Sequence, residues 1–159
     1  MRLGLAALIL VADAAAAAPP RILFAGGNWA AIDFGSRCEA RSRPLWAREK
    51  SEPLAGFAFG RGGARQGQFY VHLSRPARPG ATVIVTIGTE PFLLVGKGQW
   101  AWSRSEQQQR AMLHAARYSG AMRVESRDGR GRRIVERYAL AGAPTAIDAA
   151  AAACAGKSG

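Results

Sequence analysis

Alternation of apolar and polar residues marks the middle of the chain as strand-rich. Residues 68–74 place Phe69, Val71 and Leu73 on one side and polar residues between them, the period of two of a half-buried strand. Residues 81–88 are rich in β-branched side chains and predict a second strand. Shorter runs predict further strands over residues 27–34, 36–47, 57–60, 99–103, 121–127 and 132–140, and after Pro91.

Turn residues separate these runs. Glycine-rich residues 60–67 predict a hairpin loop, and residues 75–80 contain two prolines and predict a stiff turn. The Asp-Gly pair in residues 128–131, between two alternating runs, is typical of a hairpin. Residues 19–27 are expected to be a lead-in without regular structure, and residues 48–56 a charged, turn-like segment.

Two segments carry helical signals instead. Ser105, followed three residues later by Gln108, predicts a capping box at the start of a helix that ends near Gly120. Residues 144–154 predict a closing alanine-rich helix, with Pro144 in its first turn. Seven or more short strands with these helices indicate a mainly β fold. We expect an antiparallel β-sandwich or barrel-like domain with one internal helix and a C-terminal helix.

The N-terminus has the organisation of a secretory signal peptide. Arg2 supplies the positive charge, residues 3–12 the apolar run, and residues 14–18 several Ala-x-Ala cleavage sites. Cleavage after Ala17 leaves residues 18–159 as a single domain. The apolar run is shorter than the roughly 20 residues that span a bilayer, so no transmembrane segment is expected. These features predict a periplasmic or secreted protein.

The chain is strongly basic, with a formal net charge of +11 that arises mainly from arginine. A basic surface attracts anions, but enrichment in Arg, Ala, Gly and Pro together is also typical of a GC-rich genome. The densest cluster lies on the predicted hairpin of residues 121–140, which is a candidate docking patch or an ordinary solvated face. Its members are Arg123, Arg127, Arg130, Arg132, Arg133 and Arg137.

Cys38 and Cys154 are the only cysteines. An even number in an exported chain favours a disulfide between them, which would join the start of the domain to its end. Two free thiols and a bridge between chains are the alternatives. Two cysteines and two distant histidines do not form a metal-binding pattern, and we expect neither a metal nor another cofactor.

No catalytic motif is present. His72 and His114 are interpreted as surface residues rather than as bases or ligands, and no serine lies in a G-x-S-x-G sequence. The four tryptophans admit two interpretations, ordinary packing or an aromatic platform for sugar or lipid. They are Trp29, Trp46, Trp100 and Trp102.

The C-terminal half has a definite layout: a short helix, an Ala-Met-Arg-Val strand, a glycine-containing turn, the strand Tyr138-Ala139-Leu140-Ala141-Gly142, and a final helix with Ala146 to Ala150. This layout resembles the invasion-associated locus B family of exported Gram-negative bacterial proteins, and the early Trp29 also fits. The resemblance implies a periplasmic or surface-associated β-sandwich without an established enzymatic activity.

These observations lead to one main functional hypothesis. We expect a non-enzymatic exported envelope protein of the invasion-associated locus B type that binds an anionic envelope component or another protein, and not nucleic acid. The alternative is a periplasmic hydrolase whose active-site residues are dispersed along the chain.

Overall fold

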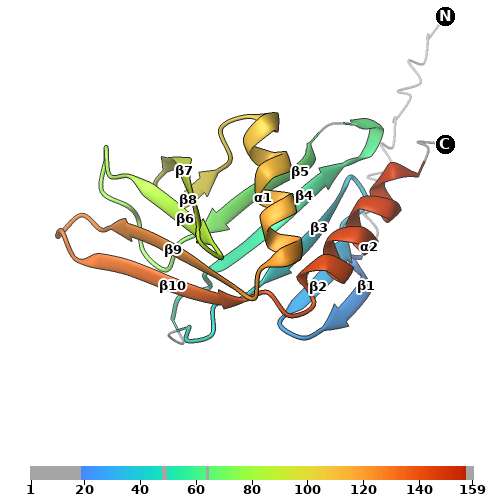
Figure 1. Ribbon diagram of the computed structural model, residues 1–159, viewed down its shortest axis with the longest axis horizontal. Helices are drawn as coiled ribbons and strands as arrows, with labels where there is room; N and C mark the ends of the chain where they lie inside the picture. Colours follow the sequence, from blue (N-terminus) through green and yellow to red (C-terminus); the bar gives the residue numbers. More distant parts are fainter. Residues whose placement is uncertain (1–18, 48–49, 64, 157–159) are drawn as a thin grey trace, which may run out of the picture.

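Ten strands form one antiparallel sheet, and two helices lie against the same side of it (Figure 1). The computed structural model describes residues 19–47, 50–63 and 65–156. The order of the strands across the sheet is β1-β2-β3-β4-β5-β8-β7-β6-β9-β10. This confirms the predicted fold class, mainly antiparallel β with one internal and one C-terminal helix. The predicted signal peptide, residues 1–17, lies outside the described residues.

The first five strands follow one another across the sheet, the next three are inserted in reverse order, and the β9–β10 hairpin forms the far edge. The strands are β1 (Arg21–Gly26), β2 (Trp29–Asp33), β3 (Arg37–Ser42), β4 (Leu54–Gly60), β5 (Gln66–His72), β6 (Val83–Ile87), β7 (Glu90–Lys97), β8 (Trp100–Trp102), β9 (Ala121–Arg127) and β10 (Arg133–Ala139). The helices are α1 (Glu106–Tyr118) and α2 (Ala143–Ala155), and a 3-10 turn (Arg61–Gly63) joins β4 to β5.

Two expectations from the sequence were wrong. The expected lead-in, residues 19–27, contains β1, which pairs with β2 alone and so forms an edge of the sheet. An edge strand with largely exposed side chains lacks the strict alternation of a half-buried strand, which explains why the pattern missed it. The expected turn-like segment, residues 48–56, already contains the first three residues of β4.

The helices begin where the sequence predicts. The Oγ of Ser105 accepts a hydrogen bond from the amide of Gln108 at 3.2 Å. The side chain of Gln108 accepts in return from the amide of Arg104 at 2.7 Å, one residue before the cap. Met112 and Ala116 are buried on the side of α1 that faces the sheet.

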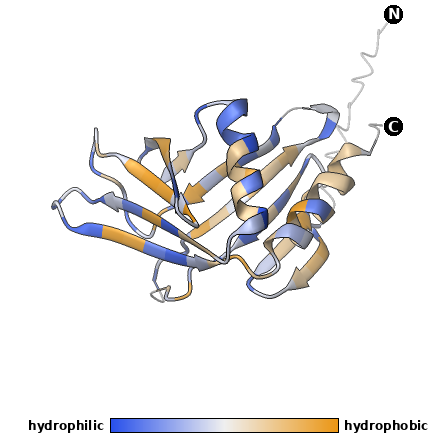
Figure 2. Ribbon diagram, in the orientation of Figure 1, coloured by the Kyte–Doolittle hydropathy of each residue, from blue (hydrophilic) through white to orange (hydrophobic). Residues whose placement is uncertain are grey.

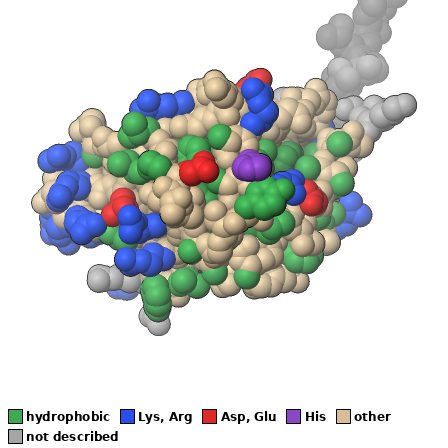
Figure 3. Space-filling model, in the orientation of Figure 1, with side chains coloured by type: hydrophobic (Ala, Val, Ile, Leu, Met, Phe, Trp, Pro, Cys, Tyr) green, Lys and Arg blue, Asp and Glu red, His purple; other side chains and the backbone are tan. Residues whose placement is uncertain are grey.

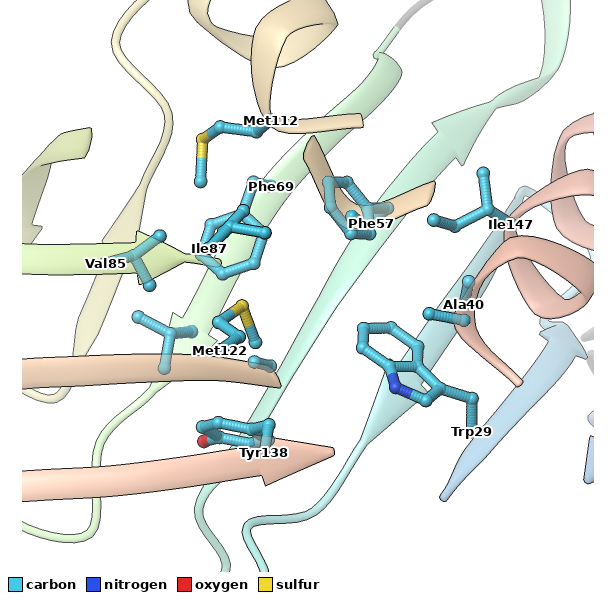
Figure 4. Packing of buried hydrophobic residues seen from close by; sticks show 14 of the residues in the cluster. Trp29, Ala40, Phe57, Phe69, Val85, Ile87, Met112, Met122, Tyr138 and Ile147 are labelled. Carbon is cyan, nitrogen blue, oxygen red and sulfur yellow. The ribbon is translucent and has the colours of Figure 1, made fainter. Parts of the chain in front are cut away.

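The core lies between the two helices and the inner face of the sheet (Figure 4). Phe57 and Phe69 from neighbouring strands meet edge to face with their ring centroids 5.2 Å apart. Met112 of α1 and Ile147 of α2 belong to the same cluster. Burying each large apolar side chain contributes about 1.5–3 kcal/mol. Figure 2 shows that β6, which supplies Val85, is hydrophobic over most of its length.

The two ends of the sheet meet at one corner. The Trp29 indole on β2 donates to the carbonyl of Ala139 on β10 at 2.9 Å, although β2 lies next to one edge strand and β10 is the opposite edge strand. The chain passes close to itself there, and a Cβ at Gly142 would collide with the carbonyl oxygen of Gly26, as one at Gly27 would with that of Ala141. Both glycines have positive φ, which other residues rarely adopt.

A disulfide joins Cys38 on β3 to Cys154 on α2, with their Cα atoms 5.8 Å apart. The predicted intramolecular pairing is therefore confirmed. It fixes the closing helix to the third strand from the N-terminal edge of the sheet.

Within the described residues, neither helix has the length and apolar character needed to cross a bilayer.

Candidate functional site: the outer face of the sheet

The face of the sheet that points away from the helices is here called the outer face. It carries exposed arginines together with exposed aromatic and apolar side chains. The strand registers place its residues in one continuous row from β10 to β3. In order across the sheet these are Val135, Glu125, Ile84, Leu93, then Val95, Trp102, Tyr70, Gly56 and Arg41. Leu93 and Val95 are each 43% exposed, so the middle of the row is apolar and open to solvent. Arginines lie on both sides of that apolar middle.

The first arginine group lies on the β9–β10 hairpin and is called the arginine face. It consists of Arg123, Arg127, Arg133 and Arg137, all exposed. Arg127 stands directly opposite Arg133, and Arg123 directly opposite Arg137. Like charges in directly opposed positions destabilise a sheet. The fold therefore gains no stability from these two pairings.

Glu125 is the one carboxylate on the outer face of this hairpin. It accepts from Arg123 at 2.9 Å and from Arg133 at 2.8 Å. The arginine face thus keeps an excess of three positive charges, since four guanidiniums share one carboxylate. Figure 3 shows basic side chains gathered at the end of the molecule where this hairpin turns.

The turn of the hairpin is organised by Asp128, which is nearly buried. Its Oδ1 accepts from the amides of Arg130 and Arg132 at 3.0 Å each, and its Oδ2 contacts the guanidiniums of Arg132 at 2.9 Å and Arg75 at 3.1 Å. Burial opposes ionisation of this carboxyl, but the two amides and Arg132 outweigh it and lower its pKa.

The structure therefore divides the six arginines predicted as one patch. Four form the arginine face, whereas Arg130 and Arg132 belong to the turn. The guanidinium of Arg132 forms an ion pair with Asp128. Sequence spacing placed all six on one hairpin but could not show this difference in their partners.

A second site, called the outer pocket, lies on the same face over β3, β4, β5 and β8. Its volume is about 500 Å³, within the range of small-molecule sites. One wall is charged and contains Arg37, Glu39, Arg41 and Arg65; the other is aromatic and contains Tyr70, Trp100 and Trp102; Leu54, Ala58 and Gln68 complete the lining.

Tyr70 connects the two walls across a glycine. Its hydroxyl donates to Oε2 of Glu39 at 2.7 Å, reaching from β5 over Gly56 on β4 to β3. A Cβ at Gly56 would lie 2.9 Å from that hydroxyl and 2.6 Å from the carbonyl oxygen of Ala40. Burial and the negative charge of Glu39 raise the pKa of Tyr70 well above its usual range, so the phenol stays protonated and remains a donor.

Glu39 is 7% exposed and compensated by cations. The Nε of Arg37 donates to its Oε1 at 2.6 Å, and Arg41 lies 3.8 Å from its Oε2. Both guanidiniums also stack on the ring of Phe34, with Cζ 4.8 Å and 5.2 Å from the ring centroid. The charged wall is therefore held in place, and its three guanidiniums exceed its one carboxylate.

The aromatic wall is fixed by ring contacts. Trp100 is 46% exposed, and its ring centroid lies 4.6 Å from that of His72 and 6.2 Å from that of Tyr70. The predicted shared face of Trp100 and Trp102 is confirmed, because Ala101 between them is buried. The other two tryptophans lie elsewhere: Trp29 is buried in the core, and Trp46 is 78% exposed on another part of the surface. The four do not form one platform.

The remaining polar candidates take part in local contacts. His72 has its Nδ1 3.0 Å from the carbonyl oxygen of Glu52, and the ring of His114 lies in a tilted contact with that of Tyr118 on α1. Each of the five described pockets contains at most one carboxylate, so none holds the pair used by glycosidases. Within the described chain, no three His, Cys, Asp or Glu side chains are grouped to hold a metal ion.

Comparison with known proteins gives no further assignment. No family model, curated protein or solved structure matches this chain.

The outer pocket was not predicted from the sequence, because its residues come from four strands and one loop. One local signal was hidden by the assignment of residues 48–56 to a turn-like segment. Gly56 lies inside a strand, where a glycine often marks a close approach to another group. In this structure that group is the hydroxyl of Tyr70.

Proposed function

We propose that the protein is a non-enzymatic exported envelope protein of the invasion-associated locus B type, which binds an anionic envelope surface through its arginine face. The observation that carries this proposal is the two pairs of directly opposed arginines on β9 and β10. Their mutual repulsion is relieved when phosphate or carboxylate groups lie between them, because guanidiniums bind such groups in a bidentate manner.

Two further features support the proposal. The Cys38–Cys154 disulfide fits the oxidising environment that the N-terminal sequence predicts. The layout of the C-terminal half, in which the arginine face lies, carries the resemblance to this family of exported proteins. An anionic surface also agrees with the net charge of +11.

The test compares two variants that have the same net charge. Arg127→Gln/Arg137→Gln removes two charges from the arginine face and leaves Arg123 and Arg133 paired with Glu125. Arg104→Gln/Arg110→Gln removes two exposed charges at the start of α1 instead. The protein without residues 1–17 is sedimented with vesicles of phosphatidylcholine, with or without phosphatidylglycerol, over a series of salt concentrations.

We expect binding only to the anionic vesicles, weakening as salt rises. The arginine-face variant should bind about tenfold more weakly or worse, since each basic residue near such a surface contributes about 1 kcal/mol. The α1 variant should bind nearly as well as the wild type. Equal losses in both variants would show that only total charge matters, and the arginine face would lose its proposed role.

A further inference from the structure

The outer pocket combines features that the arginine face lacks. Its lining joins fixed cations on one wall to a half-exposed indole on the other, with Tyr70 between them. The arginine face is an open surface of two strands, whereas this pocket has a volume of about 500 Å³. It therefore fits a small ligand or the end of a chain rather than an extended surface.

The charged wall selects for an anion. Glu39 already has Tyr70, Arg37 and Arg41 as partners, so its charge is compensated inside the protein. Arg37 contacts it through Nε, which leaves the two terminal amino groups of this guanidinium outside that bond. Arg65 at the rim has no ion pair within the described part of the chain. A carboxylate matches the planar donors of such a guanidinium.

The aromatic wall favours a ligand that presents a flat face of C–H groups. The face of an indole is electronegative and attracts positively polarised hydrogens. Trp100 is held against His72 and Tyr70, so little side-chain freedom is lost when a ligand stacks on it. A pyranose ring offers such a C–H face, and its hydroxyls suit polar groups such as Gln68 on the lining.

We propose that the outer pocket binds an acidic sugar, a pyranose unit whose ring stacks on Trp100 and whose carboxylate is held by Arg65 and the arginines beside Glu39. The site is separate from the arginine face and does not depend on the function proposed for it.

The experiment is calorimetric titration of the protein without residues 1–17. The probes are trigalacturonic acid and its methyl ester, which has the same rings without the negative charges. Two variants alter the pocket, Trp100→Ala and Arg65→Asn. Asparagine is chosen because Arg65 has a φ of +57°, a conformation that asparagine tolerates better than most residues. The matched controls are Trp46→Ala, an exposed indole outside the pocket, and Lys97→Gln, a cation opposite Trp100 that does not line the pocket.

We expect the wild type to bind the acid and to bind the ester at least tenfold more weakly, because one charged hydrogen-bonding contact accounts for roughly that factor. Each pocket variant should lose about tenfold in affinity for the acid, and both controls should match the wild type. Urea unfolding of each variant checks that it is folded.

Three results would overturn the proposal. Absence of binding would do so, as would equal binding of acid and ester. The third is loss of binding in Arg127→Gln/Arg137→Gln with full binding in Arg65→Asn, which would place the ligand on the arginine face. If the protein binds the acid in this pocket but does not bind anionic vesicles, this inference stands and the proposed function is wrong.

Discussion

At position 56 a side chain of any size would displace two neighbours. The hydroxyl of Tyr70 and the carbonyl oxygen of Ala40 both lie within 3 Å of where a Cβ would stand. Neither atom can move away easily, because the carbonyl oxygen belongs to the backbone and the hydroxyl is hydrogen-bonded to Glu39. The glycine is therefore required for a hydrogen bond that crosses the whole width of β4.

We predict that Gly56→Ala destabilises the protein by about 1–3 kcal/mol, the usual cost of overpacking a well-packed site. The added methyl group must push the Tyr70 hydroxyl off Glu39, which leaves a nearly buried carboxylate with one donor fewer. Urea unfolding measures the loss. The fluorescence of Trp100, which lies beside Tyr70, should change as well.

Gly120→Ala is the matched control. A Cβ at this position meets no atom within 4 Å, and the glycine does not have positive φ. Its effect should stay within about 0.5 kcal/mol, as for most surface substitutions. If the two variants lose equal stability, the close contact at Gly56 is not the cause.

At the scale of elements, the β9–β10 hairpin owes its shape to Asp128. This carboxylate binds the amides of its own turn and the guanidinium of Arg75 from the segment between β5 and β6. The amide of Arg78 also donates to the carbonyl of Arg127 at 2.9 Å, so residues 75–78 lie against the hairpin. The contacts of Asp128 and of residues 75–78 therefore fix the position of the hairpin that carries the arginine face.

We predict that Asp128→Asn lowers the melting temperature at neutral pH, because the amide presents an NH₂ group to Arg132 and Arg75. The pKa of Asp128 lies below its ordinary value of 3.8 in the folded protein. Its stabilising contribution is therefore complete above about pH 3.8 and is lost as pH falls through the lowered pKa. The difference between wild type and variant should shrink over that acid range in thermal melts.

Asp148→Asn serves as the comparison at this scale. A hydrogen bond from Arg117 also lowers the pKa of Asp148, but the carboxylate is 64% exposed on α2. Exposed ion pairs contribute little to stability. A melting temperature reduced as much by this change as by Asp128→Asn would contradict the role given to the turn.

Local signals predicted the elements well where each strand buries one face. Residues 68–74 and 81–88 alternate or are β-branched, and they became β5 and β6. The Asp-Gly turn and the Ser105 cap were also found, because these motifs are satisfied by residues a few positions apart. The edge strand β1 was missed for the opposite reason, since it buries little of either face.

The candidate sites, like the elements, could be predicted only where their residues lie close together in the sequence. The four members of the arginine face were among the six arginines singled out from the sequence, because they lie close together on one hairpin. The outer pocket was not, because Glu39, Tyr70 and Trp100 come together only through strand order and register. The insertion of β8 beside β5, which places Trp100 opposite His72, has no signal within either strand.

At the scale of the whole molecule, the chain closes on itself twice. The Trp29–Ala139 hydrogen bond joins β2 to the edge strand β10, and the disulfide joins β3 to the last helix. The two cysteines are 116 residues apart. In the chain-entropy account, a loop of that length restricts the unfolded chain by about 4–5 kcal/mol, although measured values are often smaller.

We therefore predict that Cys38→Ala/Cys154→Ala lowers the free energy of unfolding by about 2–5 kcal/mol. Urea unfolding with and without dithiothreitol provides the measurement and its control. The reductant should destabilise the wild type to a similar extent and leave the double variant unchanged, since the variant has no bond to reduce. Because the disulfide joins β3 to α2 and neither cysteine lines the outer pocket, the folded variant should still bind the acidic trisaccharide in buffer without urea. A wild type that is equally stable with and without the reductant would mean that the core alone holds α2 in place.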